Sequence, residues 1–225
     1  MAVKAAAALI AAALPVMLVV NGCRVLAHDW FVRFEYGREG FPPDRYGLTE
    51  PQRTWLALLG LRSIQPASEG IALLRRARLP DGTRAFNERE IRHMNDVRAL
   101  LGKAFTVQLA LISAIVAIAA AAFRSTRARK IITRGAFAGA LATLGIAALA
   151  VPILVLGFDG FFVRFHELFF AADSWRFSQT DTLLRLYPEV FWRHTAQLIA
   201  AITVAQAGLL AALAWWWIRR AGVRP

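Results

Sequence analysis

The chain has 225 residues, of which 57% are hydrophobic, and it carries a formal net charge of +12. This apolar content is high for a soluble domain of that length and favours a membrane protein. The net charge alone would suit a nucleic-acid-binding protein, but the sequence contains no nucleic-acid-binding motif. Because Cys23 is the single cysteine, an intramolecular disulfide is excluded.

Four apolar runs are long enough to cross a bilayer, at residues 5–21, 104–123, 136–156 and 196–218. A helix rises about 1.5 Å per residue, so roughly 20 residues span the hydrocarbon core. None of the runs contains a charged side chain, and one such charge at mid-membrane would cost about 3 kcal/mol. The sequence therefore predicts an all-α membrane protein, a single integral membrane domain over residues 1–225 with four transmembrane helices.

The charges outside these runs are divided unevenly. All fifteen Asp and Glu residues lie in segments 22–103 and 157–194. The remaining segments hold cations and no acid, namely Lys4, Arg124, Arg127, Arg129, Lys130, Arg134, Arg219, Arg220 and Arg224. Short loops rich in Lys and Arg are retained in the cytoplasm. We therefore expect cytoplasmic termini and two outward-facing loops, 22–103 and 157–194, that carry amphipathic interfacial helices.

The first run also resembles a secretory signal that ends at a lipidated cysteine, Val20-Asn21-Gly22-Cys23. Asn21 fits that interpretation poorly, because this position usually holds a small or aliphatic residue. A retained first helix also gives an even number of spans, which leaves the cation-rich loop and the C-terminal tail on one side. We therefore expect the first run to stay in the protein.

The first outer loop contains four predicted elements in chain order. Residues 29–36 are aromatic and alternate weakly, which favours a short extended segment. Thr49 followed by Pro51 predicts the start of a helix that continues to Leu59. Residues 68–79 form a second, short amphipathic pattern that ends at a Pro-Asp-Gly turn. Asn87 then predicts the N-terminal cap of a helix that continues into the second apolar run.

This last helix carries His93 with a carboxylate three residues to each side, at Glu90 and Asp96. Steps of three residues place the three side chains within an arc of about 120° on one face. A carboxylate could then hold the imidazole, fix its tautomer and raise its basicity for general-base work. The alternative is a solvated polar face at the head of a helix, in which Arg92 and its neighbours contact lipid headgroups.

The second outer loop carries phenylalanines at helical spacing with His166 beside them and Asp173 beyond; the phenylalanines are Phe158, Phe161, Phe162, Phe165 and Phe169. This pattern predicts an amphipathic helix in the membrane interface. Burial would lower the pKa of His166, whereas a neighbouring carboxylate such as Glu167 would raise it. The alternative is an anchoring helix whose histidine has no chemical role.

A zinc site is a competing hypothesis, because His93, Asp96, His166 and Asp173 are all competent ligands. His166-Glu167 also starts like the His-Glu-x-x-His motif, but Phe170 stands where the second histidine is needed. We therefore expect no metal. The chain also lacks a Gly-x-Ser-x-Gly elbow, a phosphate loop and a dinucleotide fingerprint, so we expect no cofactor. An enzyme of this kind would use acid and base groups on a substrate that brings its own nucleophile.

Two blocks of the sequence resemble the Lit-type lipoprotein intramolecular transacylases, a family of small bacterial membrane proteins with four spans. The first is Phe86-Asn-Glu-Arg-Glu-Ile-Arg-His-Met-Asn-Asp-Val97, where the family has a His-Met-x-Asp-Val core. The second extends from Phe158 to Trp192 and includes Trp175, Asp181 and Tyr187-Pro188-Glu189. At two places the sequence departs from the family pattern. Ser178-Gln179 stands where the family often has Asp-Pro, and Arg98 stands where it often has lysine.

The resemblance implies an acyltransferase of the bacterial cell membrane with its site on the outer face. It would move an acyl chain from the S-diacylglyceryl group of a lipoprotein to the amine of its N-terminal cysteine, giving a lyso-form lipoprotein. The catalytic residues would be His93 and His166, the supporting residues Asp96, Glu90 and Glu167, and the substrate-binding residues Trp175, Arg92, Phe162 and Phe169. An interfacial lipid hydrolase, with or without a metal, and a non-catalytic lipoprotein-binding protein are the alternatives.

Overall fold

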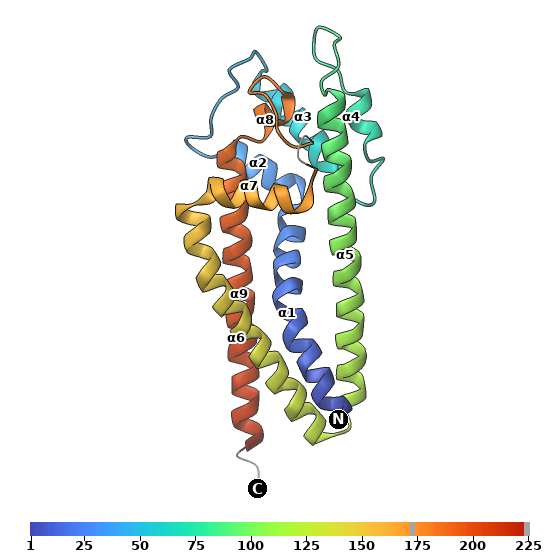
Figure 1. The fold of residues 1–225 in the computed structure, drawn as a ribbon, viewed down its shortest axis with the longest axis vertical. Coiled ribbons are helices and arrows are strands. Elements are labelled where there is room, and N and C mark those ends of the chain that lie inside the picture. Colours follow the sequence, from blue (N-terminus) through green and yellow to red (C-terminus); the bar gives the residue numbers. More distant parts are fainter. Residues whose placement is uncertain (172–173, 223–225) are drawn as a thin grey trace. The chain divides into compact units, whose positions relative to one another are not determined.

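The structure, a computed structural model, describes residues 1–171 and 174–222. All regular elements in the described residues are helices: α1 Ala2–Leu26, α2 Asp29–Tyr36, α3 Glu50–Ser63, α4 Ala72–Arg76, α5 Glu88–Ala122, α6 Thr126–Leu156, α7 Phe158–Phe169, α8 Thr182–Leu186 and α9 Glu189–Gly222 (Figure 1). The predicted all-α fold is confirmed.

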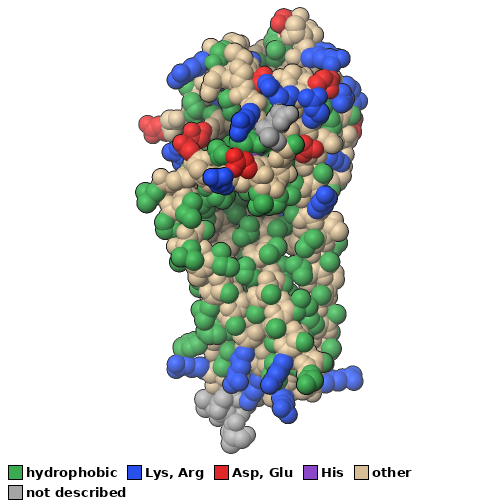
Figure 2. Space-filling view, in the orientation of Figure 1, with side chains coloured by type: hydrophobic (Ala, Val, Ile, Leu, Met, Phe, Trp, Pro, Cys, Tyr) green, Lys and Arg blue, Asp and Glu red, His purple; other side chains and the backbone are tan. Residues whose placement is uncertain are grey.

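Four of these helices, α1, α5, α6 and α9, are long and apolar enough to cross a membrane. Each coincides with one of the four apolar runs predicted from the sequence, to within one residue at the end of α5. On the face seen in Figure 2, the long helices are covered by apolar side chains between their ends. The chain is an integral membrane protein with several spans.

The chain folds as two compact units. The first comprises Met1–Cys23, Phe105–Ile153 and the chain from Gln197 onward, and the second comprises Arg24–Ala104 and Leu154–Ala196. In Figure 2 the visible acidic side chains lie over the second unit, whereas Lys and Arg alone are seen at the charged helix ends of the first. The second unit contains both predicted histidine sites.

Within the first unit, α1 and α6 pack backbone against backbone. A Cβ atom added to Gly139 would come within 2.8 Å of the Cα atom of Ala11, and one added to Gly135 would meet the carbonyl oxygen of Ala7. Small residues allow this close approach between helices in membranes. Asn21 of α1 donates its side-chain amide to Gln206 of α9, so this polar residue has a hydrogen-bond partner in the first unit.

Helix α2 corrects one sequence prediction, because residues 29–36 are helical rather than extended. Phe31, Val32 and Glu35 are all buried, and this spacing matches one face of a helix. The hydroxyl of Tyr36 donates a hydrogen bond to the carbonyl oxygen of Leu186 at 2.7 Å. Eight residues are too few for the weak alternation to decide between strand and helix.

The next two predicted helices are present, the second of them shorter than predicted. Helix α3 begins after Thr49, whose N–H donates to the side chain of Gln52 at 3.0 Å. Helix α4 covers only Ala72–Arg76 of the predicted 68–79. The guanidinium of Arg98 donates to the carbonyl oxygens of Ser63 at 2.9 Å and Gln65 at 2.8 Å, so this side chain holds the loop that follows α3.

Candidate active site

The two predicted histidines meet in the second unit. His93 lies in the first turns of α5 and His166 lies in α7. Their ring centroids are 5.9 Å apart and their planes differ by 23°, so the imidazoles are stacked. Two imidazoles at this separation repel each other when both are protonated, so the pair favours carrying at most one positive charge.

Phe165 touches the edge of the site, with its ring 5.7 Å from that of His166, and four aromatic rings lie closer to an imidazole. We call these four the aromatic cage: Phe162, Phe170, Trp175 and Phe177. The Phe170 ring lies 4.9 Å from that of His93 and 5.4 Å from that of His166. The Phe177 ring lies 5.4 Å from His93. The rings of Phe162 and Trp175 lie 4.1 and 4.8 Å from the His166 ring. The histidine pair is therefore enclosed mainly by apolar surface.

A backbone contact fixes the tautomer of His166. Its Nδ1 lies 2.8 Å from the carbonyl oxygen of Phe162, one helical turn earlier. A carbonyl oxygen only accepts hydrogen bonds, so Nδ1 carries the hydrogen and donates it. In the neutral ring, Nε2 is then unprotonated and available to accept a proton. This geometry is that of a general base.

Burial lowers the pKa of His166 below its ordinary value of 6.5, and the hydrogen bond to Phe162 opposes this shift in part. The apolar surroundings disfavour the imidazolium ion. Glu167 does not reverse the effect, because its carboxylate pairs with Arg164 at 2.9 Å on the exposed side of α7. The predicted supporting contact between Glu167 and His166 is thus replaced by an ion pair within the helix.

His93 is more deeply buried, with 8% of its surface exposed, and its Nδ1 has no hydrogen-bond partner among the described residues. The structure does not bring the two predicted carboxylates to this ring. The two carboxylates share a face of α5 with His93, but Glu90 bonds to the N–H groups of Asn87 and Leu183 and Asp96 faces outward. His93 is held by aromatic contacts instead.

Glu90 joins the start of α5 to the start of α8. One carboxylate oxygen accepts the N–H of Asn87 at 2.7 Å, while Asn87 caps the helix by accepting the N–H of Glu90 at 3.0 Å, as the sequence predicted. The other oxygen accepts the N–H of Leu183 at 2.6 Å. Asp181 adds contacts to Asn87 and Arg89, each at 2.9 Å. We call this set the α5–α8 junction.

The remaining predicted residues lie at the edge of the site or outside it. Arg92 is exposed. Phe169 is 47% exposed and packs on Phe165, with 4.9 Å between the ring centroids. Asp173 lies outside the described residues. Among the described residues, no group of three or more His, Cys, Asp and Glu side chains is placed to hold a metal ion.

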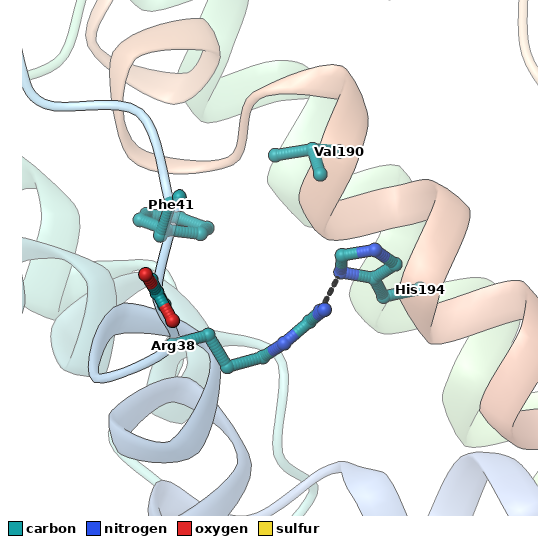
Figure 3. A pocket seen from close by; sticks show the side chains of 6 residues that line it. Arg38, Phe41, Val190 and His194 are labelled. Carbon is teal, nitrogen blue, oxygen red and sulfur yellow. Dashed lines mark hydrogen bonds between the residues drawn. The ribbon is translucent and has the colours of Figure 1, made fainter.

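Phe170 and Phe177 were not predicted from the sequence as members of the aromatic cage. A buried cluster was not predicted either, in which the fully buried Glu35 accepts hydrogen bonds from His194 at 3.0 Å and from Arg38 at 3.2 Å. Figure 3 shows the guanidinium of Arg38 directed at the His194 ring, and the two side chains are in contact. The only sequence signal was a histidine near the start of the fourth apolar run.

A small cavity adjoins this cluster, lined by Arg38, Phe41, Val190 and His194 among others (Figure 3). Its volume of about 30 Å³ has room for one or two water molecules. An acyl chain or a lipid headgroup needs far more space. The stacked histidine pair, rather than this cluster, is therefore the candidate active site.

The fold and the site define a multi-span membrane protein with a stacked histidine pair enclosed by aromatic rings. Residues 68–192 match the family model described as lipoprotein intramolecular transacylase Lit. A relative from Aquifex aeolicus (strain VF5), described as an uncharacterized protein, is 34% identical over 188 residues, which cover 83% of this chain and 82% of the relative. The chain belongs to the Lit family, which is a family of acyltransferases.

Solved structures of Lit from Bacillus cereus share the fold. A variant with one histidine mutated to alanine aligns with a TM-score of 0.77 at 20% identity, over 99% of this chain and 96% of that chain. A second Lit structure from the same organism aligns with a TM-score of 0.69 at 19% identity, over 99% of this chain and 95% of that one. These structures support the fold, and the predicted family is confirmed by the match to the family model over residues 68–192.

Proposed function

We propose that this protein transfers an acyl chain within a bacterial lipoprotein, from the S-diacylglyceryl group to the α-amine of the N-terminal cysteine. The product is a lyso-form lipoprotein with an N-acyl group. The observation that carries the proposal is the stacked His93–His166 pair, with Nε2 of His166 left as proton acceptor, in a chain of the Lit family.

His166 acts as the general base in this proposal. Its Nε2 takes a proton from the cysteine amine as the amine attacks the ester carbonyl. The tetrahedral intermediate then collapses, breaking the ester C–O bond and keeping the new C–N bond. The imidazolium returns the proton to the leaving glycerol oxygen. Amine and ester belong to one substrate molecule, so their proximity already lowers the entropic part of the barrier.

His93 stabilises the charge that develops beside His166. A neutral imidazole carries one N–H that can donate to the oxyanion of the intermediate. The aromatic cage keeps water from competing with the amine and so favours transfer over hydrolysis. Glu90 supports His93 indirectly, through the α5–α8 junction.

The substrate's chains and headgroup are assigned to the surface around the pair. The exposed apolar face of α7, with Leu168 75% and Phe169 47% exposed, suits acyl chains that enter from the lipid. Phe162 and Trp175 line the imidazole, and Arg92 is available to a phosphate or carboxylate near the membrane surface. Asp96 and Glu167 stay predictions as supporting residues.

We place the protein in the bacterial cell membrane, with cytoplasmic termini and the site on the outer face. The charge distribution supports this orientation, because the segments assigned to the cytoplasm hold nine cations and no acid. A substrate anchored in the outer leaflet would then reach α7 directly.

Mass spectrometry of a reporter lipoprotein tests the proposal. In cells that lack N-acylation, expression of this chain should convert the diacylglyceryl cysteine to an N-acyl, monoacylglyceryl cysteine of unchanged total mass. His166→Ala and His93→Ala should each lower the conversion rate by about 10²-fold or more. The exposed His28 is the matched control, and His28→Ala should keep the wild-type rate.

Other outcomes would point to other functions. Loss of one acyl chain from the reporter would indicate a hydrolase. An unchanged reporter, with the protein correctly inserted, would indicate a binding role or another substrate. Full activity in both His93→Ala and His166→Ala would show that the pair is not catalytic.

A further inference from the structure

Trp175 extends the stack of rings in the candidate active site. Its indole lies 4.8 Å from the His166 ring, with 37° between the planes, on the segment that joins α7 to α8. The Phe177 ring, two residues further on, contacts His93. The segment that carries Trp175 therefore contributes to the walls around both histidines.

The indole nitrogen of Trp175 is buried and has no hydrogen-bond partner among the described residues. An indole N–H can only donate, and leaving a buried donor unpaired is costly. Trp30 shows the usual solution, because its Nε1 donates to the carbonyl oxygen of Val25 at 3.2 Å. The indole that carries this unpaired donor packs against the ring of the proposed general base, so a substrate bound at His166 would lie next to it.

The proposed acyl transfer requires a hydrogen-bond donor of this kind. When an amine attacks an ester, negative charge develops on the carbonyl oxygen and needs a donor that is already in place. The guanidinium of Arg176 lies 5.4 Å from the Trp175 ring, and its positive charge adds to the stabilisation of an anion nearby. The indole keeps its proton throughout, so the contact involves no further proton transfer.

We propose that Trp175 is a catalytic residue whose Nε1–H donates a hydrogen bond to the ester carbonyl oxygen as this becomes the tetrahedral oxyanion. The inference rests on the proposed acyl transfer and specifies which group, besides His93, receives the charge. His166 accepts the proton of the amine, and the indole of Trp175 donates a hydrogen bond to the ester carbonyl oxygen. The site thus selects a substrate with a carbonyl oxygen next to its nucleophilic amine.

The experiment removes the N–H donor of residue 175 and keeps a fused aromatic ring of the same shape. In one variant, residue 175 is replaced by β-(3-benzothienyl)alanine, which has the shape of tryptophan with sulfur in place of N–H. A second variant, Trp175→Phe, also lacks the N–H donor. The substrate is a synthetic peptide with an S-diacylglyceryl N-terminal cysteine in detergent micelles. We expect kcat to fall about 10²-fold with the benzothienyl residue, because a donor used only in the transition state is lost. KM should stay within about twofold of the wild-type value.

Trp30→Phe is the matched control, since its N–H is already bonded to the backbone and its side chain is exposed. It should keep the wild-type kcat and KM. A wild-type kcat in the benzothienyl protein, or a loss caused wholly by a higher KM, would overturn the donor role. Neither result would affect the proposed function, which fails only if the wild-type protein itself yields no N-acyl peptide.

Discussion

At the scale of single residues, the two histidines are prepared in different ways. His166 has its tautomer fixed by the carbonyl oxygen of Phe162, which belongs to its own helix. His93 has an unpartnered Nδ1 within the described residues and is positioned by aromatic contacts. The expected arrangement, a carboxylate on the imidazole, would have raised the basicity of the ring. A backbone carbonyl orients the ring with a smaller effect on its charge, so His166 stays neutral and able to accept a proton.

The lowered pKa of His166 gives a prediction for its titration. Burial disfavours the imidazolium, so protonation should occur with a midpoint below pH 6.5. Above that midpoint the ring is the neutral base, and the base form is lost as the pH falls through it. NMR of ¹³C-labelled histidine in micelles measures the midpoint, with the His166→Ala spectrum identifying the signal.

Glu167→Gln provides the matched comparison for this titration. Its carboxylate pairs with Arg164 rather than with the imidazole, so the substitution should leave the His166 midpoint almost unchanged. A midpoint above pH 6.5 that falls when Glu167 is replaced would show instead that the neighbouring carboxylate outweighs burial.

At the scale of elements, the α5–α8 junction connects the helix that carries His93 with the segment that follows Trp175 and Phe177. Thr182 strengthens it by donating its hydroxyl to the carbonyl oxygen of Ala85 at 2.5 Å. Glu90 is the central residue, because it is 1% exposed and both of its oxygens accept backbone N–H groups. One buried carboxylate therefore joins the start of the helix that carries His93 to α8, which follows the segment with Trp175 and Phe177.

Glu90→Gln should weaken this junction. The new amide presents an NH₂ group to one of the two backbone donors, so one hydrogen bond is lost and a buried donor is left unpaired. We expect the free energy of unfolding to fall by about 1–3 kcal/mol. Denaturant unfolding in micelles, followed by tryptophan fluorescence, measures the loss.

Glu88→Gln is the control on the same helical turn. Glu88 is 48% exposed and pairs with Arg75 and Arg84, so its substitution should cost less than about 1 kcal/mol. Equal losses of unfolding free energy in the two variants would contradict a special role for Glu90 in joining α5 to α8.

Local signals explain which elements could be predicted from the sequence. The long helices follow from uncharged apolar runs, and Thr49 and Asn87 mark helix starts through contacts within three residues. The same locality made α2 ambiguous, because eight residues with weak alternation fit a strand or a helix. Its helical form becomes evident only when Phe31 and Glu35 are known to be buried together.

The candidate site was predictable only in part, because its contacts join distant segments. The two histidines could be singled out by their place near apolar runs. The partner of Glu90 is Leu183, and that of Glu35 is His194, and neither pairing leaves a periodic signal in the sequence. A three-residue step showed which side chains share a face of α5 but could not show what that face packs against.

At the scale of the whole molecule, the proposed orientation in the membrane rests on the distribution of charge. All acids lie in the segments 22–103 and 157–194, and nine cations and no acid lie in the rest of the sequence. Cations near the ends of short loops resist translocation, whereas acids contribute little. The proposed function needs this orientation, because the proposed substrate is anchored in the outer leaflet of the membrane.

Single cysteines introduced into a Cys23→Ser background test the orientation. Arg45 and Thr126 are exposed positions in an acid-containing segment and in the cation-rich loop, respectively. In intact spheroplasts, a membrane-impermeant maleimide should label Arg45→Cys and should label Thr126→Cys only after lysis. Both variants keep the cations of the short loop, so the topology signal is undisturbed. The reverse pattern would place the histidine pair on the cytoplasmic side, where a lipoprotein in the outer leaflet could not reach it, and would exclude the proposed substrate.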